Sequence, residues 1–367
     1  MNSADKLGVP KITLNQLLDL LLLIVDKIDD EKKQGIFIWG SPGIGKSDLV
    51  KTLAEKTSRE LVDIRLSTID PVDLRGLPTI DGNSSLTKWL PPDFLPQKTI
   101  KAGILFLDEI NVAPPSVQAA AYQLILDRKL GDYEVPDNWI IVAAGNRIGD
   151  RSVTFRLPTA LSNRFTHFEL DPSLEDWIEW AWENSIDPYI ISFLRFQPHL
   201  LNQFDPESNL IAFATPRSWA FASTFSDLRN INPLLYLKSI QGTLGEAVAT
   251  QFLAFLKYQS DLPNAEDILE GNEFEYPNRP DTQFLIIPSL IGKLLQTLEK
   301  KHISNFFKYV NHYSDGNYPD YAVILVKELL HASKAATNQK PELDKFRIVS
   351  DDSDFKKWVN DNIGVLS

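Results

Sequence analysis

The strongest constraint on the fold is the segment Gly40-Ser41-Pro42-Gly43-Ile44-Gly45-Lys46-Ser47. It follows a short apolar run, Ile36 to Trp39, and precedes a helical pattern from Asp48 to Lys56. A strand, a glycine loop and a helix in this order are typical of a phosphate-binding loop. The glycines let backbone N–H groups converge on phosphate oxygens, and the helix N-terminus adds partial positive charge. The alternative is an ordinary glycine-proline turn between a strand and a helix.

The last two residues of this segment have the chemistry that a nucleoside triphosphate requires. Lys46 would reach the β- and γ-phosphates, and the Ser47 hydroxyl would bind Mg²⁺. The sequence contains no Asn-Lys-x-Asp motif for guanine, so we expect ATP rather than GTP, together with Mg²⁺.

Two carboxylates follow a second apolar run, Gly103 to Leu107. Such a run suits a parallel strand that is buried on both faces. In open α/β sheets, ligands bind beyond the carboxyl ends of the strands. We therefore expect Asp108 to hold the Mg²⁺ and Glu109 to polarise an attacking water. The alternative is a strand that simply exits into solvent through two acidic residues.

A third apolar run, Trp139 to Ala144, ends in Gly145-Asn146. Asn146 at this strand end is expected to orient the water beside the γ-phosphate; alternatively it is a turn residue. The polar loop that follows contains Arg147, Arg151 and Arg156, and each is a candidate cation for a neighbouring subunit's site.

Composition excludes several classes of protein. The chain of 367 residues has 49 acidic and 37 basic residues and a net charge of −12, which weighs against a protein that mainly coats nucleic acid or anionic membrane. It has no cysteine, so disulfides and thiolate metal sites are excluded. The five histidines show no paired metal-ligand spacing and are expected to be ordinary surface or core residues: His167, His199, His302, His312 and His331.

No membrane or export segment is expected. The apolar stretch Leu17 to Val25 contains Asp19 and is shorter than the about 20 residues that a membrane span needs. A buried helix from Thr13 to about Lys32 is predicted there, after a loose arm over residues 1–12, and a cytoplasmic location is expected.

Residues 73–96 predict a hairpin that projects from the core. Asp81-Gly82 is a two-residue hairpin turn signal, and the prolines of Trp89-Leu90-Pro91-Pro92 brace the exit. The alternative is a long structural loop. After Asp171 the pattern becomes helical, with helices predicted at Arg217–Leu228, Leu234–Tyr258, Thr282–Lys300, His302–Tyr313 and Pro319–Ala336 and a peripheral acidic end.

In order along the chain, these motifs resemble the AAA+ ATPases, and among them the MoxR-like branch. The segments that carry the resemblance are the phosphate loop, Leu107-Asp108-Glu109, Ala144-Gly145-Asn146, Leu161-Ser162-Asn163-Arg164-Phe165 and Thr215-Pro216-Arg217-Ser218-Trp219. The resemblance covers about residues 15–260. It implies an α/β core with a parallel sheet flanked by helices over 1–172, a β-hairpin insert around 73–96, an all-α lid over 173–260, and additional helices over 261–367.

The resemblance also implies roles for particular residues. Asn146 matches the polar sensor, Arg164 the arginine finger and Arg217 the second sensor arginine. The alternative for Arg164 is an ordinary ion pair on the surface. The alternative for Arg217 is an ion pair at the start of a helix. The family further implies ATP hydrolysis between subunits of a ring, usually a hexamer, and chaperone-like remodelling of protein clients, often with a von Willebrand A-domain partner.

Two other functions remain open at this point. The first is an ATP-driven motor on DNA, such as a helicase or a restriction-type translocase, which the acidic composition disfavours. The second is a scaffold in which bound ATP only locks an assembly, which the complete set of acidic and sensor positions disfavours.

Overall fold

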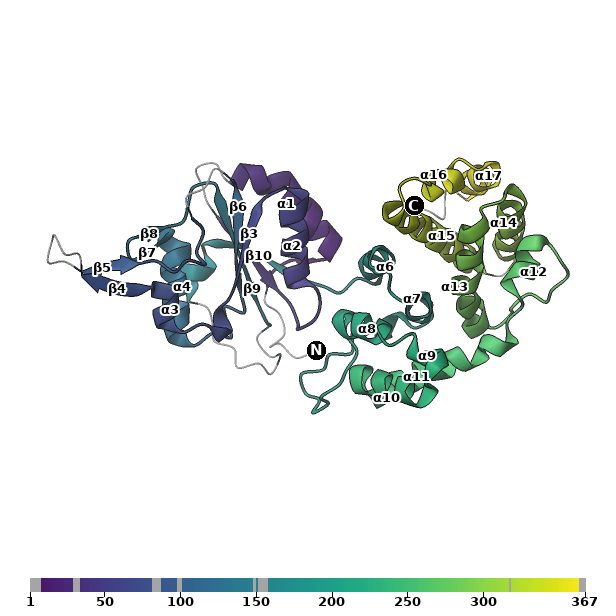
Figure 1. The fold of residues 1–367 in the computed structure, drawn as a ribbon, viewed down its shortest axis with the longest axis horizontal. Coiled ribbons are helices and arrows are strands. Elements are labelled where there is room, and N and C mark those ends of the chain that lie inside the picture. Colours follow the sequence, from purple (N-terminus) through teal and green to yellow (C-terminus); the bar gives the residue numbers. More distant parts are fainter. Residues whose placement is uncertain are drawn as a thin grey trace. The chain divides into compact units, whose positions relative to one another are not determined.

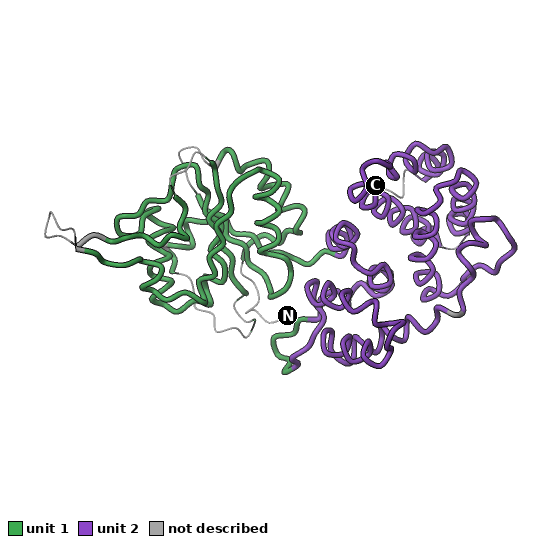
Figure 2. The backbone as a smooth tube through the Cα atoms, viewed as in Figure 1, with its two compact units in different colours: residues 1–173, 204–209 green, residues 174–203, 210–367 purple. Residues whose placement is uncertain are grey.

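The structure, a computed structural model, describes residues 8–28, 34–80, 87–97, 101–147, 150, 158–316 and 318–362. It divides into two compact units (Figure 2). Unit 1 comprises residues 1–173 and 204–209, and unit 2 comprises residues 174–203 and 210–367.

Unit 1 is built on a six-stranded sheet whose neighbouring strands are all parallel. The strand order is β1-β10-β2-β9-β6-β3. The strands are β1 (Lys11–Ile12), β2 (Gly35–Trp39), β3 (Glu60–Arg65), β6 (Gly103–Asp108), β9 (Trp139–Gly145) and β10 (Phe165–Leu170). The predicted α/β core with a parallel sheet is therefore confirmed. The expectation of a loose arm up to residue 12 is wrong at its end, because Lys11 and Ile12 pair with β10.

Helices cover both faces of this sheet (Figure 1). Ile36 and Ile38 of β2 pack in one core with α1 (Leu14–Ile28) and α2 (Lys46–Lys56). Phe37 and Trp39 point to the opposite face and pack in a second core with α4 (Pro115–Asp127) and Leu161 of α5 (Thr159–Ser162). Alternation along a strand sends successive side chains to opposite faces, so a continuous apolar run buries both.

A two-stranded antiparallel ribbon stands apart from the main sheet, as the sequence predicts. It consists of β4 (Leu77–Ile80) and β5 (Thr87–Leu90), and it follows the short helix α3 (Pro71–Arg75). The predicted two-residue turn at Asp81-Gly82 lies outside the described residues, and the pairing nearest to it joins Ile80 to Thr87. Gly76 has φ +84°, and a Cβ there would lie 2.0 Å from the Leu90 carbonyl oxygen.

A smaller ribbon, β7 (Lys129–Leu130) with β8 (Tyr133–Glu134), follows α4. The helix before it, α4, ends at Asp127, ahead of Gly131. Arg128 adopts φ +54°, a left-handed conformation that terminates the helix three residues earlier than the glycine.

Unit 2 is helical. Its helices are α6 (Leu174–Glu183), α7 (Pro188–Phe196), α8 (Pro216–Ser223), α9 (Leu228–Ile231), α10 (Pro233–Leu244), α11 (Glu246–Lys257), α12 (Ala265–Glu270), α13 (Pro280–Thr297), α14 (Lys300–Ser314), α15 (Pro319–Gln339), α16 (Lys345–Ser350) and α17 (Ser353–Asp361). None of the helices within the described ranges is long and apolar enough to cross a membrane.

Two predicted helices of unit 2 are each split. The predicted helix Leu234–Tyr258 breaks at Gly245, whose φ of +83° is incompatible with a continuous helix and where a Cβ would lie 2.7 Å from the Ala212 carbonyl oxygen. The predicted helix Arg217–Leu228 ends at Ser223, and turns lead from there into α9. The acidic end is not peripheral either, because Trp358 of α17 is 2% exposed in the core of α12 to α16.

A buried ion pair joins the first helices of unit 2 to α15. Arg195 Nε donates to Glu328 Oε1 at 2.7 Å, and Trp182 Nε1 donates to Glu328 Oε2 at 2.6 Å. The side chains of Arg195 and Glu328 are 4% and 1% exposed. Burial alone would lower the pKa of Arg195, but Glu328 and Glu175 hold that pKa above its usual value. The Arg195 guanidinium therefore remains charged inside the unit.

We expect Glu328→Leu to lower the free energy of unfolding by about 3–5 kcal/mol, because it removes the buried counter-charge of the Arg195 guanidinium and leaves only Glu175, whose side chain is 59% exposed. Chemical denaturation of unit 2 helices, followed by circular dichroism, measures this. The matched control is Lys334→Ala, which breaks the exposed pair between α15 and Glu179 of α6 and should cost less than about 1 kcal/mol. Equal losses in the two variants would contradict this account of the buried pair.

Candidate active site

The phosphate loop adopts the conformation that its glycines predict. Gly43 and Gly45 have φ of +80° and +99°, and α2 begins at Lys46 directly after Gly45. At Gly40 a Cβ would lie 2.3 Å from Ile44 Cδ1, so the loop closes tightly on itself there. The backbone therefore curls at the N-terminus of α2, where N–H groups and the helix dipole favour an anion.

The Lys46 amino group binds across the mouth of this loop. Its Nζ donates to the carbonyl oxygens of Gly40 and Ser41 at 2.7 and 3.0 Å, and it lies 3.3 Å from Asn146 Oδ1. The loop and the end of β9 are thus brought together, as expected for Lys46 and Asn146.

Ser47 and Asp108 lie side by side, as a shared Mg²⁺ site requires. Ser47 Oγ donates to Asp108 Oδ2 at 3.0 Å, and the Glu109 amide donates to Asp108 Oδ1 at 2.8 Å. Asp108 is only 5% exposed. A hydroxyl and a carboxylate in contact are oxygen ligands of the kind that Mg²⁺ accepts.

Two residues that the sequence reasoning missed hold the Glu109 side chain. The Ser67 hydroxyl donates to Glu109 Oε2, and Arg65 Nε lies 3.8 Å from Glu109 Oε1. Glu109 itself has φ of +57°, a left-handed conformation that is uncommon for a residue with a side chain. Strain of this kind clusters at functional sites. Only the pairing of β3 with β6 brings Arg65 beside Asp108, so no local pattern could have revealed these contacts.

The position of Asn146 depends on Asn111, another residue that was missed. Asn111 Nδ2 donates to the Asn146 carbonyl at 2.7 Å, and the Asn146 amide donates to Asn111 Oδ1 at 3.0 Å. Asn111 is fully buried. A Cβ at Gly145 would lie 2.6 Å from Asn111 Oδ1, so the glycine makes room for this pair. The signal in the sequence was a polar residue in the otherwise apolar Ile110–Ala113 segment.

The site carries excess negative charge next to the Ser47–Asp108 pair. Partial burial and then the charge of Asp108 raise the pKa of Asp63 on β3 above its usual value, while Arg65 acts in the opposite direction. A cation bound between Ser47 and Asp108 would relieve this repulsion.

The four candidate arginines of unit 1 differ in their surroundings. Arg147 Nε lies 3.3 Å from Glu169 Oε1, and Glu169 is 5% exposed, so this cation is engaged within its own chain. Arg164 is exposed and makes no ion pair with any residue in the described ranges. Arg151 and Arg156 lie outside the described residues. Within the described part, Arg164 is thus the more available cation.

Arg217 lies in unit 2, in the first turn of α8. A capping box fixes this turn, since Thr215 Oγ1 accepts from the Ser218 amide at 3.1 Å and Ser218 Oγ accepts from the Thr215 amide at 2.7 Å. Arg217 is exposed and makes no ion pair with a residue in the described ranges.

The residues of unit 1 fit a bound nucleotide with Mg²⁺. The Ser41 hydroxyl oxygen is buried and has no hydrogen-bond partner among the described residues, which marks an unfilled polar position inside the loop. Around the start of α2, Lys46 already contacts the Ser41 carbonyl and Ser47 already contacts Asp108. The described part of the chain contains no group of three or more His, Cys, Asp or Glu side chains that could hold a metal ion, so a metal here would be held chiefly through hydroxyl, carboxylate and phosphate oxygens.

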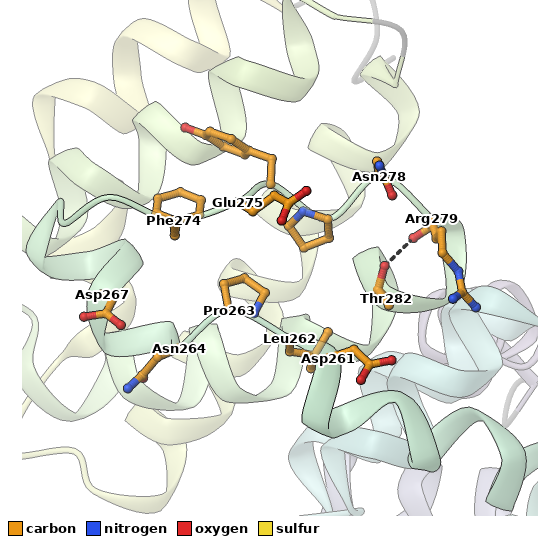
Figure 3. A pocket seen from close by; sticks show the side chains of 12 residues that line it. Asp261, Leu262, Pro263, Asn264, Asp267, Phe274, Glu275, Asn278, Arg279 and Thr282 are labelled. Carbon is orange, nitrogen blue, oxygen red and sulfur yellow. Dashed lines mark hydrogen bonds between the residues drawn. The ribbon is translucent and has the colours of Figure 1, made fainter.

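Unit 2 has a cavity of about 450 Å³ of its own, between Asp261 and Thr282 (Figure 3). Its rim includes the carboxylates Asp261, Asp267 and Glu275, and Thr282 Oγ1 donates to the Arg279 carbonyl at 2.9 Å. None of the predicted site residues lines it.

A protein-family model matches part of the chain. The model of the "ATPase family associated with various cellular activities (AAA)" matches residues 35–167, from β2 to β10. Two relatives are midasin from Giardia intestinalis, 30% identical over 173 residues, and midasin from Dictyostelium discoideum, 29% identical over 150 residues. These alignments cover 43% and 38% of this chain but only 4% and 2% of the midasins.

Solved structures with some similarity include a mutant of RuvB from Thermotoga maritima, with a TM-score of 0.37 and 17% identity over 70% of this chain and 73% of that one. A putative ATPase from Cytophaga hutchinsonii aligns with a TM-score of 0.33 and 15% identity over 94% of this chain and 82% of that one. TM-scores this low do not establish a common arrangement of the whole chain.

We expect Asn111→Ala to lower kcat for nucleotide hydrolysis by up to about 100-fold while the Kd for the nucleotide changes little, because Asn146 loses the pair that positions it. Single-turnover kinetics and a binding titration separate the two effects. Asn138→Ala, which removes an exposed bond to Lys101 elsewhere in the unit, is the matched control. A proportional loss of binding and turnover would contradict the positioning role.

The phosphate loop, both carboxylates and Asn146 all lie within the segment that the family model matches. They converge at one edge of a parallel sheet that has helices on both faces. Residues 35–167 therefore match the AAA family of ATPases in sequence and carry the residues of an ATP hydrolase.

Proposed function

We propose that this chain is a MoxR-like AAA+ ATPase that hydrolyses Mg²⁺-ATP between the subunits of a homo-oligomeric ring, a hexamer, and uses the energy to remodel protein partners in the cytoplasm. The observation that carries the hydrolytic part is the pair of contacts Lys46–Asn146 and Ser47–Asp108. These two contacts join the phosphate loop to the ends of β9 and β6.

In this proposal each residue of unit 1 has one task. Lys46 would neutralise charge on the phosphate oxygens, and Ser47 and Asp108 would hold a Mg²⁺, which would supply positive charge against the charge that develops during phosphoryl transfer. Glu109 accepts a proton from the attacking water, and Asn146 orients that water. The Ser67 and Arg65 contacts keep the Glu109 carboxylate at the strand end, where the water would lie.

The second half of the site is proposed to come from a neighbour. Arg164 is exposed and unpaired within the described ranges, whereas Arg147 is held by Glu169, so Arg164 is the better candidate for a cation donated to another subunit. Arg217 would contact phosphate from the lid, where the capping box of α8 fixes its turn. A planar cation at the transferred phosphoryl group is worth about 10³–10⁵ in rate.

The exposed apolar side chains of the hairpin support protein remodelling. Leu77 and Leu90 pair directly across β4 and β5 and are 65% and 58% exposed, and Trp89 is 38% exposed. Exposed apolar groups on a projecting ribbon suit contact with a protein client or with a von Willebrand A-domain partner.

We expect Arg164→Ala to bind ATP normally but to hydrolyse it about 10³-fold more slowly. Glu109→Gln should show the same pattern, because it removes the proton acceptor. Mixed rings of the two variants should recover activity, since an Arg164→Ala subunit keeps an intact site and a Glu109→Gln neighbour keeps an intact arginine. Lys46→Ala is the control that should lose ATP binding itself. Mixed rings that are verified by mass and remain inactive would exclude donation from a neighbour.

The net charge of −12 predicts that duplex DNA leaves the ATPase rate unchanged. ATPase assays with and without DNA at about 50 and 200 mM salt test this. Stimulation that is lost steeply between these concentrations would instead support the DNA motor, because a chain of phosphate contacts has that salt dependence.

A further inference from the structure

Trp39, His167 and Ser162 form a chain of hydrogen bonds that the proposed reaction does not use. Trp39 Nε1 donates to His167 Nδ1 at 3.0 Å, and His167 Nε2 lies 2.7 Å from the Ser162 carbonyl oxygen. This chain joins β2, β10 and the last residue of α5.

The donor at one end fixes the state of the imidazole. An indole N–H can only donate, so His167 Nδ1 must accept. The ring proton of the neutral imidazole therefore lies on Nε2, which donates to the Ser162 carbonyl. Both bonds exist together in this one tautomer, and a side chain without polar atoms would lose both.

This series of hydrogen bonds has the phosphate loop next to one end and Arg164 next to the other, and these are the two parts of the proposed site. Trp39 directly precedes Gly40, whose carbonyl accepts from Lys46 at 2.7 Å. Ser162 precedes Arg164 by two residues, and the Arg164 carbonyl accepts from the Gly35 amide at 3.2 Å. The turn that carries Arg164 is thus bonded to both ends of β2. Gly35 at the start of the strand bonds to it directly, and Trp39 at the end of the strand is connected to it through His167.

Aromatic packing leaves the imidazole little freedom. The Trp39 and His167 rings are stacked with centroids 6.1 Å apart, and Phe37 stacks on Trp39 at 4.2 Å. Phe165 meets Phe37 edge-on at 5.4 Å. A displacement of the Trp39 side chain would therefore be passed to His167 and on to the Ser162 carbonyl.

We propose that His167 is a positioning residue for Arg164. It holds the turn after α5 in register with the strand that enters the phosphate loop, and so sets how Arg164 is presented to the neighbouring subunit. This inference rests on the proposed function, since it needs Arg164 to act across an interface. His167 touches no reacting group and is not a catalytic residue.

The main test is His167→Phe, which keeps an aromatic ring and removes both hydrogen bonds. We expect kcat to fall by about 10- to 100-fold with the Kd for ATP unchanged. In mixed rings, His167→Phe should recover activity with Glu109→Gln, because the latter supplies a well-placed arginine. It should not recover activity with Arg164→Ala, because both subunits then present a defective arginine.

The control is His302→Phe in unit 2. His302 also makes two side-chain hydrogen bonds, to Glu270 at 2.8 Å and to Thr297 at 2.7 Å. We expect this variant to lower the Tm but to keep the wild-type kcat. A general loss of packing would affect the two variants alike, whereas a positioning role affects only His167→Phe.

Should His167→Phe not fold, Trp39→Phe is the second variant. It keeps an aromatic ring against Phe37 but has no indole N–H, so it removes the hydrogen bond to His167 Nδ1. His167→Gln, which can both accept and donate, should restore part of the rate. Wild-type kcat in His167→Phe or Trp39→Phe would overturn the inference, and so would recovery with Arg164→Ala. Failure of Arg164→Ala to recover with Glu109→Gln would instead overturn the proposed function.

Discussion

Parallel pairing of β2, β9 and β6 is the constraint on which the candidate site depends. Because these strands run in the same direction, their carboxyl ends meet at one edge, and the residues that follow each strand become neighbours. Lys46 can reach Asn146 and Ser47 can reach Asp108 for this reason, although 100 and 61 residues separate them in the chain. An antiparallel arrangement of the same strands would scatter these groups over two edges.

The sequence predicted the parts of this site that follow buried strands, because a continuous apolar run and a glycine loop are local signals. It did not predict Ser67 or Asn111, whose partners lie 42 and 35 residues away and are set by strand pairing. In unit 2 the pattern predicted helices but not the breaks at Gly245 and after Ser223, since tertiary contacts decide where a long apolar pattern is interrupted. The α/β core and the ATPase class are confirmed; the roles of individual residues and the domain boundary near residue 260 remain predictions.

In unit 2 a buried ion pair, in addition to apolar packing, connects the helices. Its two apolar cores share partly buried residues such as Trp182, Leu262 and Phe284, and the Arg195–Glu328 pair lies where the first helices meet α15. A buried pair of charges seldom adds net stability, but it does penalise alternative packings in which either charge is left alone. The helices after residue 261 are in this way held in one arrangement with those that precede them.

The chain passes between the two units three times, at residues 173–174, 203–204 and 209–210. A graft that exchanged everything after residue 173 for the helical part of a related protein would also carry away residues 204–209, which belong with the sheet unit. An exchange of the helical unit must therefore keep residues 204–209 of this protein, in addition to a junction after residue 173. Because the chain crosses three times, one junction alone cannot exchange the helical unit for another.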